Sequence, residues 1–255
     1  MARVVIVSGG GTGIGRAVAR RFAAEGDKVL LVGRRAEVLQ QAAAALSADD
    51  TVEGEIQTLA ADLGVAEEAG RVRAEVERRY GRVDVLVNNA GGNVEIGAPD
   101  DVPGGLEGVA WSWTGNFRSN VLTAVLLTEA LREQLQASGR RVVLLSSIAA
   151  YRGSGTGSYA AAKAALHPYA YDLAGQLGSH GATVNVVAPG YIEDTEFFRD
   201  RMTEERRKVL IAQTDTGRAG TPDDVADTVH WLSSPGAGHV TGQIVQVNGG
   251  ARYGA

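Results

Sequence analysis

The sequence predicts an α/β protein in which a doubly wound, seven-stranded parallel sheet lies between two layers of helices. Short runs rich in β-branched residues alternate with longer segments of helical periodicity, which is the pattern of βαβ units. A glycine-rich segment directly follows the first such run, as in sheets that bind a ligand beyond the carboxyl ends of their strands. No linker-like run, charge block or internal repeat divides the 255 residues, so we expect one domain over residues 1–255.

The expected strands are short apolar runs of the kind that parallel sheets bury on both faces. They lie near residues 3–7, 28–32, 55–60, 83–87, 141–145, 183–187 and 243–247. The expected helices lie near residues 14–25, 36–46, 66–80, 119–137, 158–177 and 222–232. The last helix has a clear start, because Thr221 suits the N-cap, Pro222 suits the first turn, and two carboxylates follow at the positive end of the helix dipole.

Composition and charge argue against several classes of function. The formal net charge of −5 and the lack of a Lys/Arg-rich stripe give no footprint for nucleic acid or an anionic membrane. There is no cysteine, and the four histidines are not spaced like a ligand pair, so we expect neither disulfides nor a metal centre. The first apolar run, residues 4–7, is too short for a signal peptide. We therefore expect a soluble, cytoplasmic protein.

Residues 8–15, Ser-Gly-Gly-Gly-Thr-Gly-Ile-Gly, join the first strand to the first helix. Glycines allow a tight turn there and let backbone N–H groups approach a pyrophosphate at the positive end of the helix. A plain strand-to-helix turn could use the same residues, but the apolar strand before it and the amphipathic helix after it favour a dinucleotide site. The candidate ligands are Gly9, Gly11, Thr12, Gly13, Ile14 and Gly15.

The glycine spacing Gly9-xxx-Gly13-x-Gly15 resembles that of the short-chain dehydrogenase/reductase family. Further motifs of that family follow in order along the chain: Asp62-Leu63, Asn88-Asn89-Ala90-Gly91, Asn120, Ser146-Ser147, Tyr159 with Lys163, Pro189-Gly190, Thr241-Gly242-Gln243 and Val247-Asn248-Gly249-Gly250. The resemblance covers essentially the whole chain. It implies a Rossmann-like three-layer αβα sandwich and an enzyme that uses NAD(P)(H) to interconvert a carbonyl and a secondary alcohol.

The end of the second strand bears on the choice of cofactor. NAD-preferring relatives carry Asp where this chain has Gly33, and an arginine such as Arg34 can hold a 2′-phosphate with charge-assisted hydrogen bonds. We therefore expect NADP(H) to be preferred, with NAD(H) possible. Arg35 could bind the same phosphate or be a solvated residue at the helix entrance.

The resemblance implies further contacts with the cofactor. Asp62, with Leu63, would bind the adenine, and Asn89, Ala90 and Gly91 would line the adenosine ribose, although a purely structural role is equally open for Asn89. After the sixth strand, Pro189, Gly190 and the backbone of Ile192 would lie against the nicotinamide. Thr195 stands one place later than in many relatives, so its contact with the carboxamide is doubtful.

Tyr159 and Lys163 stand four residues apart in an alanine-rich segment, which places them on one helical face. A cation there favours phenolate, so we expect Lys163 to lower the pKa of Tyr159 below its usual value of about 10. In the family, the tyrosine protonates the substrate oxygen, the lysine holds the nicotinamide ribose, and a helical asparagine, here Asn120, holds a proton-relaying water.

A serine of the pair Ser146-Ser147 would bind the same substrate oxygen. The common spacing of thirteen positions to the tyrosine points to Ser146. The local string Ser146-Ser147-Ile148-Ala149-Ala150 instead matches relatives in which the second serine acts. We choose Ser147, because a deletion in the loop 151–158 is tolerated better than a shifted strand end. Pro168 should bend the catalytic helix about one turn after Lys163.

Residues 190–215 are expected to form a lid over the substrate. Its aromatic residues Tyr191, Phe197 and Phe198 stand among acidic ones: Glu193, Asp194, Glu196 and Asp200. This composition suits a neutral or weakly polar ketone, although the aromatic residues could instead seat a lid helix.

Two other functions stay open. Reduction of 3-oxoacyl groups on acyl carrier protein needs a basic docking surface, for which only Arg132, Arg140 and Arg141 are candidates. A non-catalytic NADP(H) sensor would not need the proton relay.

Relatives also assemble through helices corresponding to 119–137 and 158–177, so we expect a homotetramer. The line Tyr169, Leu173 and Leu177 could face either the sheet or a partner.

Overall fold

The computed structural model of the chain describes residues 2–198 and 201–254. Its seven strands form one parallel sheet in the order β3-β2-β1-β4-β5-β6-β7, which confirms the expected fold class. The strands are β1 (Val4–Ser8), β2 (Lys28–Gly33), β3 (Ile56–Ala60), β4 (Val85–Asn88), β5 (Arg141–Leu145), β6 (Thr183–Pro189) and β7 (Ile244–Val247). The chain order reverses between β1 and β4, the switch point at which ligands of such sheets bind.

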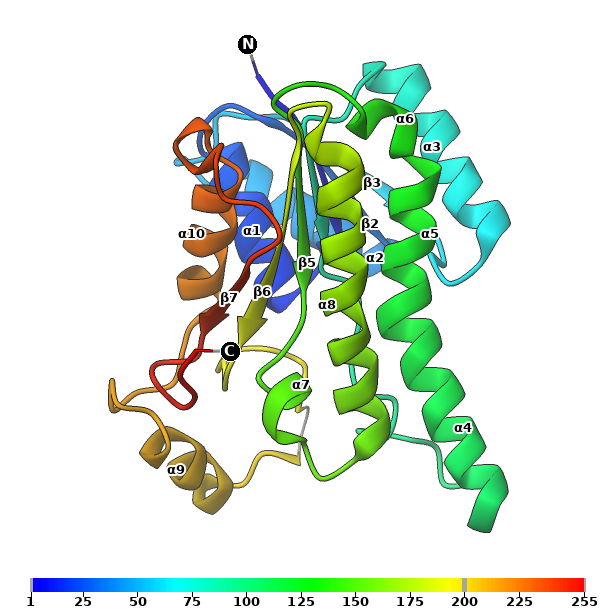
Figure 1. Cartoon of the computed structure of the whole chain (residues 1–255), viewed down its shortest axis with the longest axis vertical. Coiled ribbons are helices and arrows are strands. Elements are labelled where there is room, and N and C mark those ends of the chain that lie inside the picture. Colours follow the sequence, from blue (N-terminus) through cyan, green and yellow to red (C-terminus); the bar gives the residue numbers. More distant parts are fainter. Residues whose placement is uncertain (1, 199–200, 255) are drawn as a thin grey trace.

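Helices cover both faces of the sheet, as Figure 1 shows for α1 and α10 on one side and α5 and α8 on the other. The helices packed on the first face are α1 (Gly13–Ala23), α2 (Ala36–Ser47) and α10 (Pro222–Leu232). Those packed on the second face are α3 (Ala66–Tyr80), α5 (Thr123–Ala130) and α8 (Gly157–Gly178).

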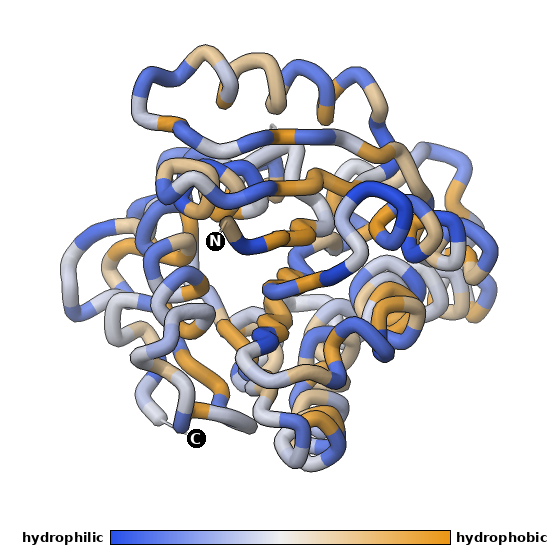
Figure 2. Tube along the Cα trace, turned by 90° about the horizontal axis from the view of Figure 1, so that it is seen from above, coloured by the Kyte–Doolittle hydropathy of each residue, from blue (hydrophilic) through white to orange (hydrophobic). Residues whose placement is uncertain are grey.

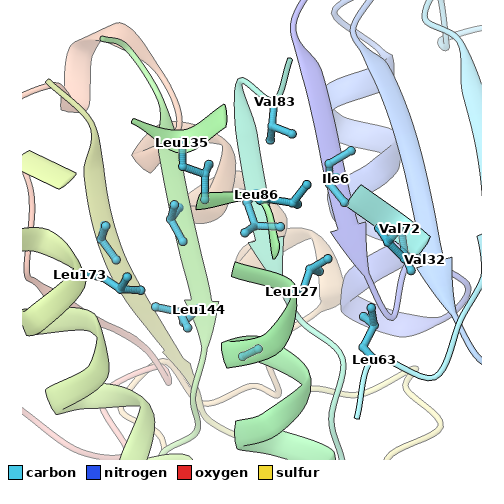
Figure 3. Close-up of a cluster of buried hydrophobic side chains, with 14 of the residues drawn as sticks. Ile6, Val32, Leu63, Val72, Val83, Leu86, Leu127, Leu135, Leu144 and Leu173 are labelled. Atoms are coloured by element: carbon cyan, nitrogen blue, oxygen red, sulfur yellow. The ribbon is translucent and has the colours of Figure 1, made fainter. Parts of the chain in front are cut away.

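Successive strand residues point to opposite faces, so each strand contributes to two cores. Val5 and Val7 pack with the helices of the first face, whereas Val4 and Ile6 pack with those of the second. Figure 3 shows the second core, where strand residues such as Ile6 and Leu86 lie close to helix residues. Figure 2 shows hydrophobic segments gathered in the interior.

The helix expected over residues 119–137 is longer and interrupted. It begins with α4 (Gly105–Phe117), passes through a π-helical turn (Arg118–Leu122), and continues as α5 and the short α6 (Arg132–Leu135). The start was placed too late because α4 contains three glycines, which disfavour helix. Two further helices were not predicted, α7 (Ala149–Arg152) and α9 (Glu204–Ala212). Both lie beyond the carboxyl ends of the strands, at the lower end of Figure 1.

Helix α8 runs without interruption past Pro168. The sequence left open whether Tyr169, Leu173 and Leu177 face the sheet or a partner. They face the sheet, because Leu173 and Leu177 are fully buried and Tyr169 packs against the same core.

Within residues 2–198 and 201–254, no helix has the length and apolar character needed to cross a membrane. The described residues also hold no group of His, Asp and Glu side chains that could bind a metal ion.

Candidate active site

The glycine-rich turn lies between β1 and α1 and has the shape of an anion cradle. Gly13 adopts a left-handed φ of 47°, which side-chain-bearing residues avoid. A Cβ on Gly15 would lie 2.2 Å from the carbonyl oxygen of Gly9, so no other residue fits there. The Thr12 side chain does not cap α1, which leaves the first-turn N–H groups without a side-chain acceptor. These features fit a pyrophosphate at the helix N-terminus.

The loop after β4 is tied to this turn. The Asn89 side chain donates hydrogen bonds to the carbonyl oxygens of Ser8 and Gly9, at 3.0 and 3.2 Å. The backbone N–H groups of Asn89 and Ala90 both donate to the Ser8 hydroxyl at 3.0 Å. Of the two roles that the sequence left open for Asn89, its side chain therefore performs the structural one.

Residues at the end of β2 offer exposed positive charge. Arg34 is exposed, and no hydrogen bond or ion pair joins it to any residue that the structure describes. Arg35 is paired instead, because its guanidinium lies 2.8 Å from the carboxylate of Glu196 in the lid. Gly33 has room for a side chain, since a Cβ there would meet Leu39 at an ordinary 3.6 Å.

The Asp62-Leu63 pair, expected to contact adenine, has other partners in the structure. One Asp62 carboxylate oxygen accepts from the Gly64 N–H at 3.0 Å, and the other lies 3.0 Å from the Arg118 guanidinium. The Leu63 side chain is buried in the core beneath the sheet. Leu63 can therefore offer only its backbone to a ligand.

Tyr159 lies near the N-terminal end of α8 and is buried, with 6% of its surface exposed. Its ring centroid is 5.5 Å from that of Phe197 in the lid. Burial raises the pKa of Tyr159 to about 12, and the neighbouring Ser147 side chain opposes this rise. The phenol is therefore protonated at neutral pH, with the chosen serine beside it.

Lys163 does not lower the pKa of Tyr159 in the structure, contrary to the expectation from the sequence. Its ammonium donates to the carbonyl oxygen of Leu145 at 2.8 Å. Burial lowers the pKa of Lys163 to about 8. The shared helical face was predicted correctly, but the sequence could not show that both groups are buried and that desolvation dominates both pKa values.

The two serines at the end of β5 differ clearly in their surroundings. The Ser146 hydroxyl is buried, donates to the carbonyl oxygen of Lys163 at 3.0 Å and lies 2.8 Å from His167 Nε2. The Ser147 hydroxyl accepts from the Ala149 N–H at 3.1 Å and lies beside the Tyr159 side chain. Ser146 thus braces α8, while Ser147 faces the phenol.

Asn120 lies in the π-helical turn and is buried. Its amide group bonds to both the N–H and the C=O of Gly92, at 3.0 and 2.8 Å, which fixes the loop after β4. A Cβ on Gly91 would lie 2.4 Å from Asn120 Oδ1 and 3.2 Å from the Lys163 ammonium nitrogen. Gly91, Asn120 and Lys163 therefore converge on one point. Such π-helical turns are frequent at functional sites.

The segment after β6 closes the site. The Gly190 N–H donates to the Val247 carbonyl oxygen at 2.9 Å, and the Ile148 N–H donates to the Pro189 carbonyl oxygen at 2.8 Å. Ile192 forms a parallel bridge with Gly220, in which Tyr191 and Glu193 make the hydrogen bonds. The Ile192 N–H makes no backbone hydrogen bond within the described chain, so it is available to an acceptor on a ligand.

The other lid residues lie around this bridge. The Thr195 side chain packs 3.3 Å from the position that a Cβ of Gly13 would take, and its hydroxyl donates to the Ile192 carbonyl at 3.3 Å. The rings of Phe197 and Phe198 pack edge to face with their centroids 4.9 Å apart, and the Phe197 ring also packs against the Tyr159 ring. Asp200, named with the acidic lid residues, lies outside the described residues.

Sequence reasoning missed a polar network beside Tyr159. Ser158 Oγ lies within 2.9 Å of the Asn116 amide nitrogen and of Glu95 Oε1, and within 2.8 Å of the Ser112 hydroxyl. Asn116 is fully buried and also binds the Val94 N–H at 3.2 Å. No local pattern marks these residues, because they meet only when α4 packs against α8.

Comparisons with known proteins agree with this architecture. The family model described as "Enoyl-(Acyl carrier protein) reductase" matches residues 9–252. The chain is 32% identical to the short-chain reductase protein NovJ of Streptomyces niveus, covering 97% of this chain and 93% of that protein. It is also 32% identical to the 3-oxoacyl-[acyl-carrier-protein] reductase FabG of Escherichia coli, covering 97% and 96%.

Solved structures show the same likeness. A short-chain type dehydrogenase/reductase from Mycobacterium ulcerans superposes with a TM-score of 0.86 at 30% identity, covering 98% of this chain and 89% of that one. A short-chain dehydrogenase/reductase from Brucella melitensis, described as a glucose/ribitol dehydrogenase, gives the same score and identity over 99% and 97%.

Proposed function

The chain belongs to the short-chain dehydrogenase/reductase family, and we propose that it is an NADP(H)-dependent oxidoreductase interconverting a carbonyl and a secondary alcohol. The observation that carries this proposal is the buried Tyr159 phenol beside Ser147, with Lys163 one turn further on the same helix. The single catalytic domain of residues 1–255, the lid near 190–215 and the cytoplasmic location inferred from the sequence belong to the same proposal.

A nicotinamide held by Pro189, Gly190 and Ile192 would supply hydride for the carbonyl carbon, or accept it from the alcohol. Tyr159 gives its proton to the carbonyl oxygen, and Ser147 donates a hydrogen bond to the same oxygen. The raised pKa of Tyr159, to about 12, keeps the phenol protonated at neutral pH, which is the state that can give a proton to the carbonyl oxygen. The Lys163 side chain, whose pKa burial lowers to about 8, would hold the nicotinamide ribose while protonated.

The remaining roles follow the same logic. Asn120 fixes the loop after β4 and would hold the proton-relaying water. Gly9, Gly11, Thr12, Gly13, Ile14 and Gly15 would hold the pyrophosphate, and Asp62, the backbone of Leu63, Ala90 and Gly91 the adenosine. Pro189, Gly190 and Ile192 would hold the nicotinamide.

The preference for NADP(H) rests on Gly33 and Arg34. The absence of a carboxylate at position 33 removes a group that would repel a 2′-phosphate, and the exposed Arg34 supplies opposite charge. Arg35 would bind the phosphate only after leaving its ion pair with Glu196.

A second candidate substrate is a 3-oxoacyl group on acyl carrier protein, favoured by the similarity to FabG. The three arginines that could compensate for the acidic surface are engaged elsewhere. Arg132 pairs with Glu129 at 2.6 Å, Arg140 pairs with Asp84, and Arg141 is buried. Docking of an acidic carrier protein is therefore less well supported than a small ketone substrate.

We also expect a homo-oligomer, most simply a dimer of dimers. An apolar stripe runs along the outer face of α4: Leu106, Val109, Trp113 and Phe117, exposed by 87, 53, 52 and 47%. Residues spaced by three and four share one helical face. Monomeric proteins rarely expose so continuous an apolar surface, so a second copy related by a twofold axis is its expected cover.

The direct test is to measure NADPH consumption against a broad panel of carbonyl compounds, including 3-oxoacyl thioesters. NADP⁺ reduction by secondary alcohols is run alongside. Reduction of at least one small ketone, with faster turnover than for the thioesters, is the expected result. Turnover of thioesters alone would replace the first candidate with the second, and no turnover in either direction would contradict both.

A further inference from the structure

The first turn of α8, which carries Tyr159, has no side-chain cap of its own. The Thr156 side chain at the N-cap position does not cap the helix, and the loop before it contains Gly153 and Gly155, both with positive φ. Helices commonly satisfy one of their first N–H groups with a side-chain oxygen at the N-cap. The place of this turn must therefore be fixed by contacts from elsewhere in the chain.

Those contacts come through Ser158, the residue next to Tyr159. Ser158 is buried, and its hydroxyl donates to Glu95 Oε1 at 2.9 Å. The Asn116 side-chain nitrogen donates to the same hydroxyl, also at 2.9 Å. A carboxylate near the first turn of a helix is stabilised by the positive end of the helix dipole. Glu95, in the loop after β4, thus supplies the anchor that the N-cap lacks.

Asn116 connects this anchor to the π-helical turn. It is fully buried on α4, and its side-chain oxygen accepts from the Val94 N–H at 3.2 Å. Its carbonyl oxygen accepts from the Asn120 side chain at 2.9 Å. One residue therefore bonds to the turn that carries Tyr159, to the loop after β4 and to Asn120. In a buried polar network of this kind, loss of one partner leaves the other groups unpaired.

We propose that Asn116 and Ser158 are positioning residues: they fix the first turn of α8 relative to the π-helical turn and so hold the Tyr159 phenol where it can meet a carbonyl oxygen. Both act through Tyr159 and Asn120 and touch no substrate themselves. Misplacement of a reacting group by about 1 Å can cost on the order of a hundredfold in rate. The inference rests on the proposed function, because it assigns these residues a role in that reaction.

The test compares two buried asparagines. Asn116→Leu keeps a branched side chain but removes its hydrogen bonds. Asn185→Leu is the matched control, because Asn185 is also buried and bonds to two backbone groups, at 2.8 and 3.1 Å, on the sheet face that α10 covers. Both variants should have a lower Tm. Only Asn116→Leu should lower kcat for ketone reduction, by about tenfold or more, with the Kd of NADPH unchanged.

Ser158→Ala breaks the network from the other side and leaves the fold of α4 intact. It should lower kcat by a similar factor, and the double variant should lose little more than either single one, because both changes remove the same hydrogen bond. Equal falls of kcat in Asn116→Leu and Asn185→Leu would reduce the network to general stability. That result, or an unchanged kcat in both Asn116→Leu and Ser158→Ala, would overturn the inference.

Amide hydrogen exchange of the protein without cofactor gives a readout that does not depend on turnover. In Asn116→Leu, exchange should be about tenfold faster in peptides covering residues 157–166 and 116–124. Asn185→Leu should leave both peptides unchanged. Faster exchange at both places in a protein that reduces no carbonyl compound would support the positioning role and sink the proposed function. Ketone turnover, with exchange and kcat unchanged in Asn116→Leu, would do the opposite.

Discussion

Replacing Arg34 by leucine should weaken NADPH binding about tenfold and leave NADH binding nearly unchanged. A hydrogen bond to a charged group contributes about 1.5–3 kcal/mol, which corresponds to a factor of roughly ten to a hundred in affinity. Arg34 is exposed, so solvent screening places the effect at the lower end of this range. Arg35 cannot take over without giving up its 2.8 Å ion pair with Glu196.

The assay is titration of both dinucleotides, followed by nicotinamide fluorescence at low and moderate salt. Arg73→Leu is a matched control, because it removes an exposed positive charge from the middle of α3. It should change neither affinity. The pair Gly33→Asp with Arg34→Leu should reverse the cofactor order, since a side chain at position 33 meets Leu39 only at 3.6 Å. Tighter binding of NADH by the wild type, or equal losses for both dinucleotides in Arg34→Leu, would refute the reasoning.

Four further outcomes follow from the same geometry. Ser147→Ala should lower kcat for reduction about a hundredfold, whereas Ser146→Ala should mainly lower thermal stability; equal losses of kcat would reverse their roles. The Lys163 ammonium loses its proton as the pH rises through about 8, so kcat for reduction should fall above that pH, and a rate that is flat to pH 10 would contradict this. Gly15→Ala should abolish binding of both dinucleotides in a calorimetric titration, because its Cβ would lie 2.2 Å from the Gly9 carbonyl oxygen; retained binding would show that the loop relaxes. Trp113→Glu should shift the particle mass seen by light scattering toward the 26.6 kDa of one chain, and an unchanged oligomer would remove α4 from the interface.

The strands were predictable because each is a short β-branched run that a buried parallel strand requires. Arg141–Leu145 was placed at its observed limits, and the other strand ends differ by a few residues at most. The helix Ala66–Tyr80 was equally clear, since it ends at Gly81 in the left-handed conformation. Local sequence preference and tertiary packing agree at these places.

The α4 region was not predictable from local pattern. Gly105, Gly108 and Gly115 disfavour helix, and the stripe along its outer face is exposed, so no amphipathic period points to the core. The expectation that Lys163 lowers the pKa of Tyr159 was wrong for a related reason. Their spacing gave the shared face, but burial depends on residues distant in sequence, such as Phe197 of the lid.

The polar network around Ser158 shows the same limit. Ser158 forms hydrogen bonds with Asn116, which lies 42 residues earlier in the sequence, and with Glu95, which lies 63 residues earlier. Motif reasoning finds residues that a family shares, whereas these contacts depend on how one helix packs on another.

The most direct test of the proposed chemistry is the turnover of Tyr159→Phe on the best carbonyl substrate that the panel yields. The substitution removes only the hydroxyl and keeps the ring that packs against Phe197 at 5.5 Å, so NADPH binding should be retained. Turnover should fall about a hundredfold or more, because the substitution removes the proposed proton donor beside Ser147. Turnover near the wild-type value, with intact NADPH binding, would show that Tyr159 is not the proton donor.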